Sequence, residues 1–249
     1  MLKKIFSLQD FVLLPIKFNP MRRFFFALAL LGGLSGYAQA PSTVVDTLYL
    51  EDQFNIGISY NWLISSPSDL KQHNFSRTLF GGYQRDIPLN KKRNIGLAMG
   101  AGYSYSLTYM NLQAKEQNGD ITYAITSIKD QKIKDCYYEQ HSLDLLPLEF
   151  RWRTSTPYSH KFWRVYTGLK ASYVFASNYK FRNDAQSYHF SDPHLKGYTE
   201  WKLYTAVGHN TWNIYIQYAF RPLLKGLQAE NGASIESQIL NIGLIFYIL

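Results

Sequence analysis

The feature of this 249-residue sequence that most constrains its fold is a long alternation of apolar and polar residues. In Ile95–Tyr109, apolar or aromatic residues at odd positions alternate with Gly, Ala, Ser and Thr at even positions. Phe54–Trp62 and Trp163–Phe175 show the same two-residue period. Because successive side chains of a strand point to opposite faces, each segment predicts a strand with two unlike faces. At about nine to fifteen residues, these strands are long enough to cross a bilayer at a tilt.

We therefore expect an all-β fold, a single closed antiparallel transmembrane β-barrel of eight strands. A soluble all-β protein is the alternative, but its strands would be shorter and its turn signals more frequent. The mean hydropathy of -0.23 argues against a bundle of membrane helices. The strands are expected at Gln53–Ser65, Asn74–Arg85, Arg93–Leu112, Gln140–Arg153, Phe162–Phe181, Gly197–His209, Trp212–Phe220 and Gln238–Leu249.

The predicted connections alternate in length. Three are tight, at Asp86–Lys92, Thr154–Lys161 and Asn210-Thr211, and four are long. The longest runs from Gln113 to Glu139, and its Asn118-Gly119 pair predicts a hairpin turn. This asymmetry is typical of an outer-membrane barrel, with short periplasmic turns and long extracellular loops. With an even number of strands, both termini would be periplasmic.

The segment "LEFRWR" shows where the charges of such a barrel belong. Leu148, Phe150 and Trp152 alternate with Glu149, Arg151 and Arg153, and a charge on the lipid face at mid-depth would cost about 2–4 kcal/mol. We therefore expect the charged face to line the lumen. The predicted lumen charge network comprises Glu149, Arg151, Arg153, Arg164, Lys170, Glu200 and Lys202. Because an eight-stranded lumen is just wide enough for side chains to fill, this network should form a closed plug and not a pore.

The first 40 residues read as a leader that is removed. "MRRFFFALALLGGLSGYAQA" has a basic start, an apolar run and a small-residue cleavage site, which predicts a signal peptide starting at Met21 and cut after Ala40. Residues 41–52 would then be a periplasmic segment and residues 53–249 the barrel. The leader carries five basic residues and one acidic residue, about half of the formal charge of +8. The remaining charge is too small to argue for nucleic acid as a partner.

The last strand carries a candidate assembly signal. In "NIGLIFYIL", Asn241, Gly243, Phe246 and Ile248 have a spacing that resembles the signal read by the outer-membrane barrel assembly machinery. That machinery would be a partner during insertion, and outer-membrane lipid would surround the finished barrel. The alternative is an ordinary buried strand.

A basic group lies near the first tight turn. Arg85, Lys91, Lys92 and Arg93 could contact an acidic periplasmic partner, or they could simply flank the membrane in water.

Residue types that carry chemistry are present but are not arranged as a site. In "HSLD", His141 and Ser142 would point to opposite faces of one strand and so cannot converge as a triad. His189, Asp192 and His194 share one loop and could bind a metal, but such residues are also common in polar surface loops. Cys136 is the single cysteine and cannot form an internal disulfide. We therefore expect no enzyme activity, no metal and no cofactor.

Three blocks carry a resemblance to a known family. Gly81–Ser106, Leu146–Phe175 and Ile242–Leu249 resemble the PorT family of Bacteroidota outer-membrane proteins, and "FRWRTST" with "KFWR" is the most specific part. The resemblance implies an accessory component of type IX secretion, which exports cargo bearing a C-terminal sorting domain and is linked to gliding motility. It implies protein partners in a larger outer-membrane complex and no catalytic residues.

Two other functions remain open on the sequence. The chain could be a subunit of another outer-membrane complex, such as the barrel assembly machinery or an uptake assembly. It could also be a free-standing small barrel that serves adhesion or envelope stability.

Overall fold

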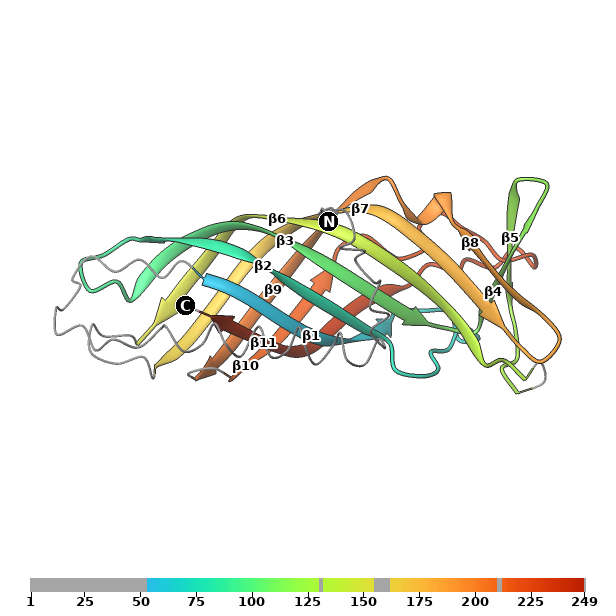
Figure 1. Ribbon diagram of the computed structural model, residues 1–249, viewed down its shortest axis with the longest axis horizontal. Coiled ribbons are helices and arrows are strands. Elements are labelled where there is room, and N and C mark those ends of the chain that lie inside the picture. The colour runs from blue at the N-terminus through green and yellow to red at the C-terminus, as the bar shows by residue number, and fades with distance from the viewer. Residues whose placement is uncertain (1–52, 130–131, 155–161, 210–211, 249) are drawn as a thin grey trace, which may run out of the picture. The chain divides into compact units, whose positions relative to one another are not determined.

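The structure is a computed structural model that describes residues 53–129, 132–154, 162–209 and 212–248. Within them, eight long antiparallel strands form a closed barrel (Figure 1). These strands are β1 (Gln53–Ile64), β2 (Arg77–Pro88), β3 (Ile95–Tyr109), β6 (Asp135–Arg153), β7 (Trp163–Arg182), β9 (Tyr198–His209), β10 (Trp212–Ala219) and β11 (Gln238–Ile248). The order around the barrel is β6-β3-β2-β1-β11-β10-β9-β7, and pairing of β6 with β7 closes the ring. The predicted eight-stranded antiparallel barrel is confirmed.

The seam between the first and last barrel strands has a continuous register. β1 pairs with β11 from Phe54↔Ile248 to Ile64↔Gln238, so the chain enters and leaves the barrel at the same end. A Cβ on Gly243 would collide with the carbonyl oxygen of Ile58 on β1. Glycine at this position therefore allows the two strands to pack closely at the seam.

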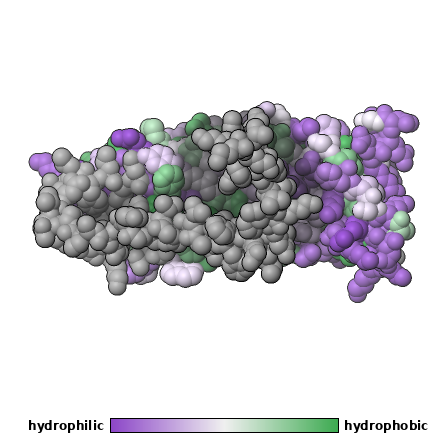
Figure 2. Space-filling model, viewed as in Figure 1, coloured by the Kyte–Doolittle hydropathy of each residue, from purple (hydrophilic) through white to green (hydrophobic). Residues whose placement is uncertain are grey.

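The long connections lie together at the opposite end, where they form further structure. β4 (Leu112–Gln117) and β5 (Asp120–Ile125) form a hairpin, and β8 (Ser187–Ser191) pairs with the end of β7. The turn residues Asn118 and Gly119 have positive φ angles of 53° and 90°, as the predicted Asn-Gly hairpin turn requires. A short 3₁₀ helix, η2 (Pro193–Leu195), follows β8. Hydrophilic residues gather at the end that carries β4 and β5 (Figure 2).

The alternation in the sequence becomes an alternation of exposed and buried side chains. On β1, Phe54, Ile56 and Ile58 are exposed on the outer face, whereas Ser59 and Asn61 are buried inside the barrel. The outer face also carries exposed tryptophans, among them Trp152, Trp163 and Trp212. Among the described residues, no helix is long and apolar enough to span a membrane.

A bulge at Pro147 determines which residues of β6 face inward. From Cys136 to Leu146 the buried residues are at even positions, but from Glu149 to Arg153 they are at odd positions. The pairing of β6 with both β3 and β7 shifts by one residue at this point. Proline has no N–H to donate to a ladder and is found at bulges within sheets. The extra residue turns the charged side chains after it into the lumen.

Several strand ends shift by one to three residues from the predicted bounds, and three differences bear on the site. β2 continues to Pro88, three residues past the predicted end at Arg85, so Asp86 belongs to a strand and not to the start of the turn. β6 begins at Asp135, five residues before the predicted Gln140, because the strand extends beyond the barrel alongside β7. β8 was not predicted from the sequence, because its five residues are too short for a clear alternation. The predicted signal peptide and the 41–52 segment lie outside the described residues, as do most of Thr154–Lys161 and all of Asn210-Thr211.

Candidate functional site

The deepest charged group in the lumen is centred on Arg151 of β6. Its Nε donates to Glu149 over 2.6 Å, one Nη donates to Gln84 over 2.7 Å, and the other lies 3.5 Å from Asp86. The hydroxyl of Tyr204 also donates to Glu149. The Arg151 guanidinium lies 4.8 Å from the ring centroid of Tyr166. Both the charge and the hydrogen-bonding capacity of the buried guanidinium are therefore satisfied inside the protein.

Arg153 connects this group to the tight turn between β2 and β3. Its Nη2 donates to Asp86 over 2.6 Å, and its Nε donates to the carbonyl of Arg93 over 2.8 Å. Asp86 thus bridges two buried arginines. The predicted second strand ends at Arg85, so the sequence did not place the Asp86 carboxylate in the lumen. Had the strand been extended to Pro88, the alternation would have placed Gln84 and Asp86 together on the inward face.

Arg164 is held differently from the other two arginines. Its guanidinium packs on the rings of Phe162, Tyr166 and Tyr247, at 4.6, 5.8 and 5.2 Å. Its Nε and Nη1 have no hydrogen-bond partner among the described residues. Its positive charge is therefore stabilised by aromatic faces.

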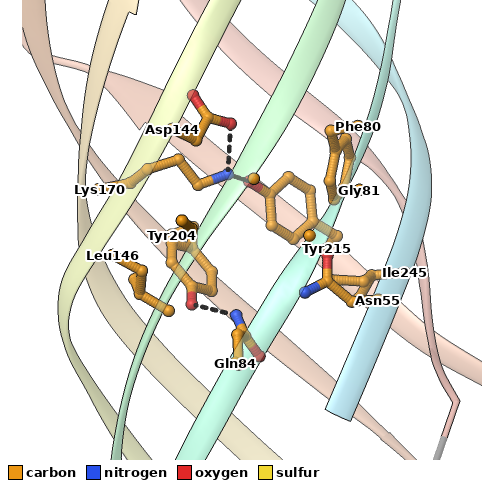
Figure 3. A pocket seen from close by; sticks show the side chains of 13 residues that line it. Asn55, Phe80, Gly81, Gln84, Asp144, Leu146, Lys170, Tyr204, Tyr215 and Ile245 are labelled. Atoms are coloured by element: carbon orange, nitrogen blue, oxygen red, sulfur yellow. Dashed lines mark hydrogen bonds and ion pairs between the residues drawn. The ribbon is translucent and has the colours of Figure 1, made fainter.

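A second charged group lies around Lys170 of β7 (Figure 3). The Nζ of Lys170 is 3.5 Å from Asp144 and donates to the Tyr215 hydroxyl over 3.3 Å. Asp144 also accepts from Ser104 over 2.5 Å and from Ser172 over 2.6 Å. The rings of Phe80, Tyr204 and Tyr215 surround the ammonium at 5.2–5.7 Å.

The remaining predicted lumen residues form their own pair. Lys202 and Glu200 lie on the same strand, β9, with Nζ and Oε1 2.7 Å apart. Their side chains are 13% and 14% exposed, so this pair is more open than the one around Arg151. All seven residues of the predicted network lie inside the barrel, but they belong to separate groups and not to one continuous chain of ion pairs.

Neutral polar side chains fill the lumen between Lys170 and the end that carries the long connections. Asn61 accepts from Thr78 and from Asn241, each over 2.7 Å, and donates to Ser106 over 2.9 Å. Gln217 extends this group by donating to Asn241 over 3.0 Å. The group joins strands β1, β2, β3, β10 and β11 across the interior, so it stabilises the closed barrel.

Two small cavities lie inside the barrel beside Lys170. A cavity of about 30 Å³ lies on one side of Lys170, and another of about 40 Å³ lies on the other side. Lys170, Phe80 and Tyr215 line both cavities. Figure 3 shows these side chains around the first cavity. Each cavity has room for only a few water molecules. Around Lys170 the lumen is therefore filled mainly by side chains.

At the end that carries the long connections lies an apolar core, which we call the cap core. It consists of Leu63, Leu70, Met110, Leu112, Ala114, Tyr123, Cys136, Tyr138, Tyr179, Phe181, Leu195, Leu223, Leu224, Ala229 and Ile235. These residues come from all four long connections and from the adjoining strand ends. The Tyr123 hydroxyl donates to the buried Asp192 over 2.9 Å, and burial raises the pKa of Tyr123. The connections therefore fold into an ordered cap.

Comparison with models of protein families agrees with this architecture. A family model described as an outer membrane protein beta-barrel domain matches residues 37–239. The chain belongs to this outer-membrane β-barrel family. A search of curated proteins returned no match.

Two solved structures similar to this outer-membrane barrel are of Ail, the attachment invasion locus protein of Yersinia pestis. One contains the heparin analogue sucrose octasulfate; it is 12% identical, covers 80% of this chain and 99% of Ail, and has a TM-score of 0.35. The other is 13% identical, covers 81% of this chain and 100% of Ail, and has a TM-score of 0.34.

The four residues of the candidate assembly signal lie on β11 of this outer-membrane barrel. Asn241 is buried in the lumen and Gly243 lies at the β1 seam. Phe246 packs against Trp212 with ring centroids 5.2 Å apart, and Ile248 is exposed on the outer face. Each residue thus has a structural role in the finished barrel, whichever role it has during assembly.

The basic residues near the first turn are not a single patch. Lys91 and Lys92 are exposed in the turn. Arg93 is half-buried with a positive φ of 55°, and its carbonyl accepts from Arg153. Arg85 is exposed on β2, opposite Met99, and so lies on the outer face of the barrel. Only Lys91 and Lys92 are therefore well placed to reach a partner in water.

The other candidate chemical residues are also separated. On β6, His141 is half-buried on the outer face beside Tyr103 and Glu139, whereas Ser142 is buried inside. Asp192 and His194 lie together, but His189 is exposed on β8. Among the described residues, no group of three potential ligands could hold a metal ion. Cys136 is buried in the cap core, where its Sγ lies 3.2 Å from the Leu112 carbonyl oxygen and 3.3 Å from the Tyr179 hydroxyl.

Proposed function

We propose that this protein is a non-enzymatic, non-conducting accessory barrel of the type IX secretion system. The observation that carries the proposal is the packed interior around Lys170. The two cavities there have volumes of about 30 and 40 Å³, which is too small for a polypeptide or a folded cargo to pass. Such a barrel acts through its outer and end surfaces, as a scaffold for a larger channel or an aid to its assembly.

The resemblance of three sequence blocks to the PorT family supports the link to type IX secretion. In the proposed orientation the tight turns, the start of β1 and the end of β11 face the periplasm, and the cap faces the cell exterior. The exposed Lys91 and Lys92 would then be available to an acidic periplasmic partner.

Affinity purification from native outer membrane in mild detergent, followed by mass spectrometry, tests the partner. We expect type IX components to dominate and deletion of the gene to trap cargo in the periplasm. A Lys91→Glu/Lys92→Glu variant reports on the turn, and a matched Lys129→Glu/Lys225→Glu variant at two exposed positions of the other end controls for the change of charge. Recovery of assembly-machinery or uptake subunits, or of no partner, would favour the alternatives and overturn the proposal.

A planar-bilayer recording tests the mechanism separately. The purified barrel should show no stable conductance, because side chains pack its lumen. A large, steady current would contradict a scaffold role even if the partners were those expected.

A further inference from the structure

The cap contains a strand with an unpaired edge. β8 pairs with β7 on one side, from Asn178↔Ser191 to Arg182↔Ser187, and is the last strand of its sheet on the other. It lies where β7 has left the barrel and no longer pairs with β9, whose pairing ends at Val174↔Tyr198. No described strand covers this edge.

The hydrogen bonds at the two ends of this ladder show which backbone groups point away from β7. The amide of Asn183 donates to the Gln186 carbonyl over 2.9 Å, and the amide of Asp192 donates to the Ser177 carbonyl over 3.1 Å. Because bonded and non-bonded pairs alternate in an antiparallel ladder, the intervening even-numbered residues also bond to β7. The N–H and C=O groups of Ser187, His189 and Ser191 therefore point to the open edge.

This edge borders a groove of about 380 Å³ between β8 and the β4–β5 hairpin. The groove is lined by Gln186, Tyr188, His189 and Phe190 on one side and by Lys115, Glu116 and Gln117 on the other. In the hairpin, the amide of Thr126 donates to Asn111, so the odd residues of β4 bond to β5 and the even residues point away. The Leu112 carbonyl fits this pattern, because it accepts from Tyr179 across the cap core. The N–H and C=O groups of Glu116 therefore point away from β5, and Glu116 itself lines the groove.

Two aromatic rings give the groove a fixed apolar wall. Tyr188 and Phe190 are half-buried, with ring planes only 12° apart. Tyr188 stacks on Phe181 at 5.1 Å, and Phe190 lies 5.4 Å from Tyr179. Gln113 also donates to the Tyr188 hydroxyl over 3.0 Å. The rings are thus held by the cap core and would lose little freedom on binding a ligand.

Lys196 contacts one end of the edge, where its Nζ donates to the Ser191 hydroxyl over 2.9 Å. The remainder of the edge lacks the usual protection against strand pairing. Natural proteins commonly block exposed edges with lysine, proline or a bulge. Here the residues with outward backbone groups are two serines and a histidine, and the β7–β8 register is continuous. His189 lies opposite Lys180, so the other face of the strand is basic.

We propose that the β8 edge binds an extended polypeptide segment of a partner protein by strand addition. The segment alternates apolar residues, which pack on Tyr188 and Phe190, with acidic residues, which lie beside Lys180 and His189. Its backbone bonds to Ser187, His189 and Ser191.

The test uses the full chain in detergent micelles and a fluorescent seven-residue peptide that alternates valine and glutamate. Anisotropy should show saturable binding below about 1 mM. Two N-methylated peptides provide the backbone control: one is methylated at the odd-numbered amides and the other at the even-numbered amides. One of the two should bind at least about tenfold more weakly than the parent peptide, because its methylated amides are those that would donate to the edge.

Two substitutions separate the backbone from the side chain. His189→Pro removes the imidazole and an outward N–H, whereas His189→Ala removes the imidazole but keeps the N–H, so the comparison of the two isolates the backbone group. The proline variant should bind at least about tenfold more weakly than the alanine variant. If His189→Pro fails to fold, Ser187→Pro and Ser187→Ala serve as the second pair. No saturable binding of the parent peptide, equal binding of both N-methylated forms and the parent, or equal binding by the proline and alanine variants would overturn the proposal.

Discussion

The Nε of Arg151 donates to Oε1 of Glu149 over 2.6 Å, and neither side chain is exposed, although the residues lie only two positions apart on one strand. A pair this close in sequence forms because β6 turns both side chains into the same packed interior. Gln84, Asp86 and Tyr204 complete its contacts from β2 and β9. The pair is therefore a junction between strands far apart in the sequence, and loss of one charge alone would leave the other buried without its partner.

Removing one charge of this pair should destabilise the barrel strongly. Glu149→Gln leaves the guanidinium of Arg151 buried with less compensation, and breaking a buried pair in this way costs about 3–5 kcal/mol. The measurement is the free energy of unfolding in urea with the barrel in lipid vesicles, followed by tryptophan fluorescence.

The matched control is Glu200→Gln, which breaks the more open pair with Lys202. It should cost clearly less, because water can reach the lysine that remains. Equal losses from the two variants would show that burial of the Arg151 group does not determine its contribution.

Deleting Pro147 should prevent correct assembly. Without the bulge, either the residues before it or the charged residues after it would face the wrong side, and each arginine on lipid costs about 2–4 kcal/mol at mid-depth. Pro147→Ala keeps the number of residues and should still fold. The readout is the shift in gel mobility between unheated and heated samples; a normal shift for the deletion would show that the bulge does not set the register.

The positions of the barrel strands could be predicted from the sequence because alternation over long segments has one interpretation. The inward face of Glu149, Arg151 and Arg153 could also be predicted, because lipid excludes charge. Their partners could not: which of Gln84, Asp86 or Tyr204 meets them depends on register between strands that one sequence does not encode locally.

The cap could not be predicted for a different reason. Its apolar residues, such as Leu70, Leu195 and Ile235, are scattered over four connections without a period. Only the Asn118-Gly119 turn carried a local signal, and it located the hairpin correctly. Packing among distant loops, which determines whether Asp192 lies beside Tyr123 or His189, leaves no pattern in the sequence.

The cap should open more readily as the pH falls. His73 lies in the connection between β1 and β2 and packs edge-on to Tyr109, and burial lowers its pKa below 6.5 although Asp135 opposes this shift. The opened loop therefore binds a proton more readily than the closed one, so this contribution to stability is present above pH 6.5 and is lost below it. Cleavage by a protease in excess should increase from about pH 7.5 to about pH 5.5.

His73→Phe keeps a ring and removes the titration, so it should flatten this pH dependence. His209→Gln, at an exposed position on β9, is the control and should leave it unchanged. An identical pH profile for His73→Phe and the wild-type protein would exclude His73 as the group responsible.

Cys136 should report the opening of the cap directly. Its thiol is fully buried in the cap core, near the Leu112 carbonyl and the Tyr179 hydroxyl, so a thiol reagent can reach it only when the cap opens. Labelling of the folded barrel should be at least about a hundredfold slower than labelling in denaturant, since opening of a packed core costs several kcal/mol.

Tyr179→Ala, which leaves a cavity beside the Cys136 thiol, should speed labelling. A Cys136→Ser/Asn231→Cys variant places the thiol at an exposed cap position and should react at the denatured rate; if Cys136 reacted as fast as that control, the cap core would not be closed.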